Sequence, residues 1–199
     1  MPEMTSLTKA WAPKPTATPG LRSTPPPRPS PSAPREPGRS IPGAPPEVVQ
    51  AAPEVTARLT RGGYVFPVFG SAAFGNTFGA FRADVAGKWH HGEDLVAPVG
   101  TPILAVADGT LFSVGWNDIG GWRLWLRDAG GNEFYYAHLS AYSPLAIAGK
   151  RVKAGDVLGF VGDSGDADGG VPHLHFEIHP GGGGPVPPYP IVTGWPRAG

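Results

Sequence analysis

Proline divides this chain into two parts that are expected to fold differently. Fourteen of its 26 prolines lie within the first 46 of its 199 residues. Proline has no backbone N–H to donate to a helix or sheet, and this stretch carries too little apolar surface to offset the entropy of ordering. We therefore expect residues 1–50 to be a disordered Pro-rich spacer, with an extended stalk or a Pro-rich ligand as alternatives. Residues 51–199 are expected to form a single folded domain.

Short apolar segments separated by turn residues characterise this second part. From Tyr64 onward they alternate with Gly, Asp and Asn at intervals of roughly ten residues, and no sustained 3.6-residue period is present. The pair Asp108-Gly109 predicts a hairpin between the first two strands. The pattern indicates an all-β fold, either a two-sheet antiparallel sandwich or a partly open barrel. The predicted strands are 101–107, 110–116, 123–127, 133–139, 157–161 and 174–178.

Composition and charge restrict the functions that the chain can have. The absence of cysteine excludes disulfides, thiol nucleophiles and cysteine-ligated zinc. The formal net charge is zero, so no global charge points to nucleic acid or to an anionic membrane. No apolar run reaches the roughly 18 residues of a transmembrane segment, and the first 20 residues lack the apolar centre of a secretory signal. We expect a monomer that binds no nucleic acid.

Histidine and aspartate occur in two spacings that suit a metal ion. His90 and Asp94 lie four residues apart in HHGED, so an extended segment places both on one face. Gly92 between them would let the backbone bend so that both reach one ion. His173 and His175 flank one residue of a predicted strand and therefore share a face, while their neighbours point into the core. Imidazole nitrogens and a carboxylate oxygen are ligands that suit Zn²⁺.

A further histidine, His138, stands in the segment YYAHL (residues 135–139). Strand alternation predicts that it lies on the face of Phe134 and Tyr136. Two histidines and one aspartate leave the fourth position of zinc open for water, as in catalytic rather than structural sites. Zinc lowers the pKa of such a water to roughly 7. Two histidines then remain, one for a general base and one for a developing oxyanion.

With these residues in place, the chain resembles the LytM/lysostaphin-type peptidases, which are zinc metallopeptidases built on the duplicated hybrid motif. The resemblance extends from about Tyr64 to Trp195. In the closing PVPPYP (residues 185–190) the chain departs from the family, where an asparagine precedes a proline. The matching segments are FGAFR (78–82), HHGEDLVAPVGTPILAVADGTL (90–111), YYAHLS (135–140), VKAGDVLGFVGDSG (152–165) and PHLHFEIHPGG (172–182).

The resemblance implies an activity and a role for each residue of the site. A member of this family hydrolyses peptide bonds in the stem peptides or cross-bridges of peptidoglycan. The zinc ligands of the family match His90, Asp94 and His175. Its general base matches His173, and the histidine that steadies the oxyanion matches His138.

Three further residues are assigned by the same resemblance. Arg82 matches an arginine near the substrate groove. His91 and His179 match no ligand and are expected at the surface or rim. A location in the cell envelope or outside the cell follows from the family alone.

Two other functions compete with the endopeptidase. A non-catalytic or latent envelope regulator, such as an amidase activator or scaffold on the same fold, predicts gaps in the ligand and catalytic set, and the sequence has none. A carrier domain is suggested by VKAGDVLGFVG, which is similar to the hairpin of lipoyl carriers. Such carriers need a lysine at the hairpin tip, whereas Lys153 precedes the turn. Zinc content would separate a carrier from the enzyme.

Overall fold

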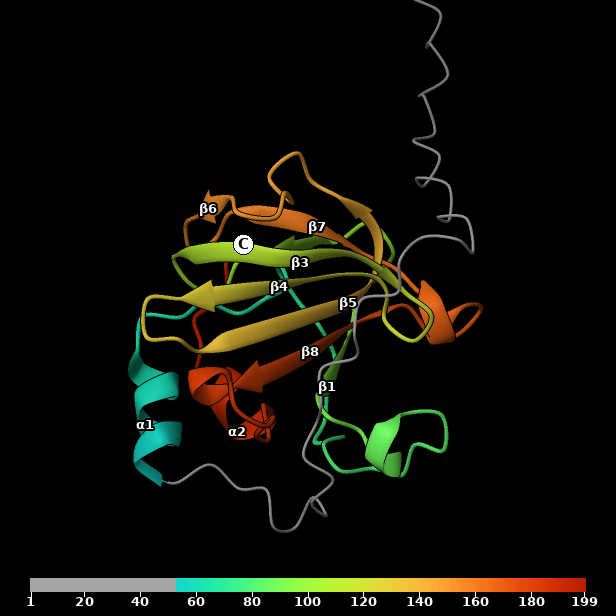
Figure 1. Ribbon diagram of the computed structural model, residues 1–199, viewed down its shortest axis with the longest axis horizontal. Helices are drawn as coiled ribbons and strands as arrows, with labels where there is room; N and C mark the ends of the chain where they lie inside the picture. Colours follow the sequence, from blue (N-terminus) through green and yellow to red (C-terminus); the bar gives the residue numbers. More distant parts are fainter. Residues whose placement is uncertain (1–52) are drawn as a thin grey trace, which may run out of the picture.

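The computed structural model of the protein describes residues 53–199, so the predicted spacer lies outside the described residues. Strands dominate this part of the chain, and helices are short (Figure 1). The helical elements are α1 (Pro53–Arg61), η2 (Ala86–Lys88), η3 (Gly165–Ala167), η4 (Pro180–Gly182) and α2 (Tyr189–Val192). The strands are β1 (Glu93–Val96), β2 (Pro102–Leu104), β3 (Gly109–Asn117), β4 (Gly121–Asp128), β5 (Glu133–Tyr142), β6 (Arg151–Val152), β7 (Val157–Val161) and β8 (His173–His179).

The strands form one open antiparallel network rather than two separate sheets. Its main path runs β1–β8–β5–β4–β3–β6, and β2 joins through β7, which also pairs with β5. Figure 1 shows β4, β5 and β8 side by side across the middle of the domain, with β3 and β7 above them. The predicted all-β fold is confirmed, and of the two predicted forms the partly open one is observed.

Strand β8 places apolar side chains on its core face and polar side chains on the face of the predicted site. Leu174, Phe176 and Ile178 are completely buried in the hydrophobic core. His173 and His175 point to the opposite face, as the alternation of side chains in a strand requires. The prediction that the two histidines share a face is confirmed.

Strand β5 changes partner at His138. Its first half pairs with β8 and its second half with β7, and His138 lies between the two ladders with a φ of 63°. This left-handed backbone is rare for a residue other than glycine. It interrupts the alternation, so the imidazole turns away from the buried Phe134 and Tyr136 and lies 5.9 Å, ring to ring, from His175. The prediction that His138 shares a face with Phe134 and Tyr136 is therefore wrong.

The turn at Asp108-Gly109 does not close a hairpin. Strand β2 pairs with β7, whereas β3 pairs with β4 and β6. The Asp108 carboxylate instead accepts hydrogen bonds from Lys153 Nζ at 2.7 Å and from the Ala154 backbone N–H at 2.9 Å. The predicted hairpin is wrong because Asp108 connects the segment between β2 and β3 to the turn between β6 and β7, and β2 and β3 do not pair with each other.

Helices α1 and α2, which were not predicted from the sequence pattern, lie together beside the sheet (Figure 1). Helix α1 is only nine residues long and buries Leu59 against the core. The Leu59 carbonyl accepts a hydrogen bond from Trp195 Nε1 at 2.8 Å, and Trp195 stacks on Tyr64 with centroids 5.2 Å apart. None of the helices in residues 53–199 has the length and apolar character needed to cross a membrane.

Candidate metal centre

Three predicted ligands converge on one point between β1 and β8. Asp94 and His175 are directly opposite each other in the antiparallel ladder, so their side chains share a face. His90 precedes β1. Its Nε2 lies 3.1 Å from Asp94 Oδ1 and 2.9 Å from His175 Nδ1, and the last two atoms are 3.1 Å apart. In residues 53–199 this is the one group of three such donors close enough to hold a metal ion.

The far nitrogen of each ligand ring fixes which atom faces the centre. His90 Nδ1 lies 3.0 Å from the Thr77 carbonyl, and His175 Nε2 lies 2.9 Å from Glu177 Oε1. Both oxygens can only accept, so both of those nitrogens carry hydrogen. Lone pairs of His90 Nε2, His175 Nδ1 and Asp94 Oδ1 therefore meet about 3 Å apart, which is repulsive unless a cation lies between them.

The donor set fits zinc. Zinc–nitrogen bonds of about 2.0–2.1 Å at tetrahedral angles place ligand atoms about 3.3 Å apart, close to the spacing found here. His90 and His175 are buried, whereas the side chain of Asp94 is 30% exposed, which leaves one side of the centre open. Burial raises the pKa of Asp94, but hydrogen bonds to His175 and His90 outweigh it and hold the pKa far below its usual range.

The protonation of His175 in the metal-free protein follows from its neighbours. Burial opposes a charge on this ring, yet hydrogen bonds to Asp94 and Glu177 outweigh it and raise the pKa of His175 to about 9. A proton on Nδ1 then takes the place that a metal ion would occupy between the ring and Asp94.

The two remaining histidines lie next to the three ligands, 4.8 Å apart ring to ring. His138 Nδ1 donates to the Ser164 carbonyl and His173 Nδ1 donates to the Val171 carbonyl, each at 2.8 Å. The Nε2 atom of each ring is thereby left as the acceptor that faces the site. His173 Nε2 lies 3.5 Å from Asp94 Oδ1. Burial, together with the nearby His175 and His173, lowers the pKa of His138 to about 3, so this ring is neutral.

Gly92 lies at a bend before β1 and also provides space for the site. A Cβ atom at this position would lie 2.5 Å from the Phe176 carbonyl oxygen and 2.8 Å from His175 Cε1. Any side chain at Gly92 would therefore push the ring of His175 out of place. The expected bend at Gly92 is observed, together with a close approach of the chain to β8.

His91 and His179 are both buried, with 6% and 3% exposure, so the prediction of surface or rim positions is wrong. His91 packs edge-on against Trp89, with centroids 4.2 Å apart, and burial lowers its pKa. His179 lies on the site face of β8, under Trp125. The neighbour of His91 is close in sequence, whereas Trp125 comes from another strand, β4, which the local sequence around His179 does not reveal.

Sequence analysis also missed Glu177, which lies between His175 and His179 along β8. Its pKa is held far below the usual range because hydrogen bonds to His175 and His179 outweigh the effect of burial. The available signal was the alternation itself. Residues 173, 175, 177 and 179 are all polar and are two apart, which places all four on one face of a strand.

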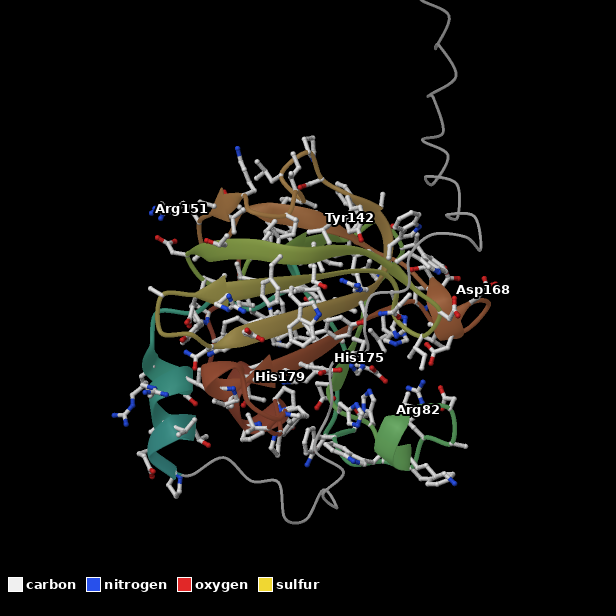
Figure 2. The ribbon with its side chains drawn as sticks, viewed as in Figure 1. Arg82, Tyr142, Arg151, Asp168, His175 and His179 are labelled. Carbon is white, nitrogen blue, oxygen red and sulfur yellow. The ribbon has the colours of Figure 1, made fainter. Side chains whose placement is uncertain are left out.

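Arg82 links two loops at the edge of the site. Its guanidinium donates to Asp84 at 2.7 Å and to Asp166 at 2.5 Å. Asp166 Oδ1 also lies 3.8 Å from His138 Nε2. Figure 2 shows Arg82 on the loop before β1, below His175. These contacts place Arg82 one residue, Asp166, away from His138, and its position near a substrate groove stays a prediction.

Comparison with known proteins gives consistent matches. Residues 88–188 match peptidase family M23. The L-Ala–D-Glu endopeptidase of Bacillus subtilis is 31% identical over 142 residues, covering 67% of this chain and 44% of that protein. The DD-carboxypeptidase/endopeptidase Mpg of Neisseria meningitidis serogroup B is 36% identical over 139 residues, covering 69% of this chain and 31% of that protein. The chain thus spans less than half the length of these two relatives.

A solved structure extends the likeness to the fold. The catalytic domain of the antimicrobial peptidase lysostaphin from Staphylococcus simulans superposes with a TM-score of 0.54 and 29% sequence identity. The match covers 61% of this chain and 92% of that domain. It therefore includes nearly the whole catalytic domain of that peptidase.

Proposed function

Since this chain belongs to peptidase family M23, we propose that it is a zinc-dependent endopeptidase that hydrolyses peptide bonds in the stem peptides or cross-bridges of peptidoglycan. The observation that carries this proposal is the convergence of three lone pairs, from His90, Asp94 and His175, next to two further histidines. His173 Nε2 lies 3.5 Å from Asp94 Oδ1, and the ring of His138 lies 5.9 Å from that of His175. Because the substrate is cell-wall material, we also propose a location in the cell envelope or outside the cell, and we propose that the protein is monomeric.

The roles of the ligands follow from their geometry. His90, Asp94 and His175 would hold zinc through Nε2, a carboxylate oxygen and Nδ1, with the open side next to Asp94 left for water and substrate. Zinc, when bound, lowers the pKa of its water to about 7 and polarises the carbonyl of the scissile bond.

Two histidines move protons in this proposal. His173 Nε2 is an acceptor 3.5 Å from the ligand Asp94, so it can take the proton of the attacking water and return it to the leaving amine. Neutral His138 accepts at Nε2 in the resting enzyme. A proton taken up from solvent at Nε2 would make His138 a donor to the tetrahedral oxyanion, because the developing negative charge raises the proton affinity of this ring.

The relatives of this chain differ in the bond for which they are named. The two relatives are named for an L-Ala–D-Glu bond and for D,D bonds, so their names do not agree on one substrate. The alternative, a non-catalytic or latent envelope regulator, is not favoured, since all five ligand and catalytic residues are present and lie together.

Digestion of purified peptidoglycans tests the proposal. The full chain is incubated with peptidoglycans that differ in cross-link type, and soluble products are identified by mass. Matched samples contain a chelator, or a chelator followed by excess zinc. We expect peptide-cleaved fragments that disappear with the chelator and return with zinc. Release that is insensitive to the chelator, or no release from any substrate by the zinc-loaded protein, would contradict it.

A further inference from the structure

A buried row of polar side chains runs along β8 away from the metal centre. His175, Glu177 and His179 are 8%, 6% and 3% exposed and lie on the same face of the strand. Figure 2 shows His175 and His179 at two points along β8. Glu177 bridges the two rings, with Oε1 at 2.9 Å from His175 Nε2 and Oε2 at 2.6 Å from His179 Nε2. A buried carboxylate that uses both oxygens in this way has a specific partner for each.

The hydrogen bonds along this row determine which nitrogen of His175 faces the metal centre. His179 Nδ1 lies 2.8 Å from the Gly183 carbonyl, which can only accept, so Nδ1 carries hydrogen. One further proton must be shared between His179 Nε2 and Glu177 Oε2, because two lone pairs would repel at 2.6 Å. The other carboxylate oxygen receives the Nε2 hydrogen of His175. The Nδ1 lone pair of His175 is then left to face His90 and Asp94.

The packing around the row keeps it from adopting another arrangement. Trp125 lies against His179 with centroids 5.0 Å apart, and Tyr135 lies 6.1 Å from His175. The Gly183 carbonyl that ends the row belongs to the residue after η4, the short helix that directly follows β8. His175, Glu177 and His179 are all buried, and a buried polar group without a partner is costly.

We propose that Glu177 and His179 act together as a positioning pair, which fixes His175 with Nδ1 toward the metal and thereby sets the affinity of the protein for zinc. This inference rests on the proposed function in one respect only, namely that zinc is held by His90, Asp94 and His175. Neither residue of the pair touches the metal or the substrate. Partners of this kind, which hydrogen-bond a ligand histidine, typically change metal affinity by about 10–100-fold when they are removed.

Zinc affinity of the full chain, measured by competition with a chromophoric chelator, tests the pair. Glu177→Ala is expected to weaken zinc binding by about 10–100-fold. Glu177→Gln keeps an oxygen for His175 and an amide N–H for a neutral His179, so it should recover most of the lost affinity. His179→Asn acts through Glu177 and should weaken binding by less than Glu177→Ala.

Ile178→Val is the matched control. Ile178 lies between the pair on the same strand but points into the core, completely buried. This variant is expected to lower the thermal midpoint while the zinc affinity stays within about twofold of wild type, because a purely structural loss on β8 does not reach the ring of His175. Equal losses of zinc affinity in Ile178→Val and in Glu177→Ala would overturn the inference.

The tautomer of His175 provides a readout that stability cannot imitate. Long-range ¹H–¹⁵N spectra of the histidine rings should show His175 protonated at Nε2 in zinc-loaded wild type and in Glu177→Gln. Glu177→Ala should lose the hydrogen-bonded Nε2 signal of His175. If Glu177→Ala is too unstable to give a spectrum, the spectra and zinc affinities of Glu177→Gln and His179→Asn test the inference. Unchanged spectra and affinities in all three variants would overturn the positioning pair. Wild type that binds no zinc would instead refute the proposed function on which it rests.

Discussion

His175 and His138 face the same centre, with rings 5.9 Å apart, yet the chain holds them in different ways. His175 sits in a regular strand and its far nitrogen is bound by a side chain, Glu177. His138 sits where the ladder of β5 breaks, and its far nitrogen is bound by the backbone of Ser164. The first can be disturbed by one side-chain substitution. The second can be disturbed only by moving the loop after β7.

The largest effect should come from removing the two histidines that do not bind metal. His138→Ala and His173→Ala are each expected to lower kcat by roughly 10²–10⁴-fold, the usual contribution of a positioned acid or base. Zinc content should stay at the wild-type value, since both rings are held by backbone carbonyls outside the ligand set. Steady-state kinetics on the identified substrate and metal analysis of the same samples check this. Full activity in either variant would remove the assigned role.

A glycine substitution tests whether the loop alone positions His138. Gly121 has a φ of 61°, and a Cβ there would lie 2.3 Å from Ser164 Oγ and 2.4 Å from the Ser164 carbonyl carbon. Gly121→Ala should displace the Ser164 carbonyl and lower kcat by about 10²-fold, as misplacement of a catalytic group by about 1 Å can do. Zinc affinity should not change.

Gly115→Ala is the control for that loop. Gly115 lies in the neighbouring strand of the same hairpin, and a Cβ there meets no atom within 4 Å. This variant should keep wild-type kcat. Equal kcat losses in the two glycine variants would mean that the hairpin as a whole, and not the contact with Ser164, supports His138.

Zinc binding should depend on pH through His175. Hydrogen bonds to Asp94 and Glu177 outweigh burial and raise the pKa of His175 to about 9 in the metal-free protein, so its Nδ1 is protonated at neutral pH. That proton must leave before the metal binds. The zinc Kd should therefore rise about tenfold for each unit that pH falls below 9. Calorimetry in buffers of different ionisation enthalpy would detect the released proton, and a Kd constant from about pH 6 to 8 would contradict the assignment.

The smallest effect is expected at Arg82. Its side chain is 29% exposed and those of Asp84 and Asp166 are 47% and 21% exposed, so each pair contributes about 0–1 kcal/mol. Arg82→Ala should lower the free energy of unfolding by no more than about 1 kcal/mol and leave zinc affinity unchanged. Denaturant titration and chelator competition measure both. A loss of zinc would show that the loop before β1 holds the metal centre in place.

Local alternation explains which parts of the fold and site were predictable. Strand β7 is the predicted segment 157–161, and the core-facing Leu174 and Phe176 follow from period two. The three proposed ligands lie within short local segments, HxxxD and HLH, so their convergence could be expected from the sequence.

What sequence reasoning missed depends on contacts between distant segments. The partner of β2 is β7 rather than β3, a pairing decided by how the whole network closes. The face of His138 depends on a backbone angle at one residue, which no pattern of side chains encodes. Glu177 and His179 are different, since their hydrogen-bond partners, His175 and the Gly183 carbonyl, are close in sequence, and only the packing of Trp125 against His179 comes from a distant segment.

Metal analysis of the full chain and of His175→Ala, after dialysis against zinc and then buffer, tests the central claim most directly. The account predicts a single zinc ion per wild-type chain and none in His175→Ala, with both proteins folded by circular dichroism. Wild type without zinc, or zinc retained undiminished in folded His175→Ala, would contradict a centre built from His90, Asp94 and His175.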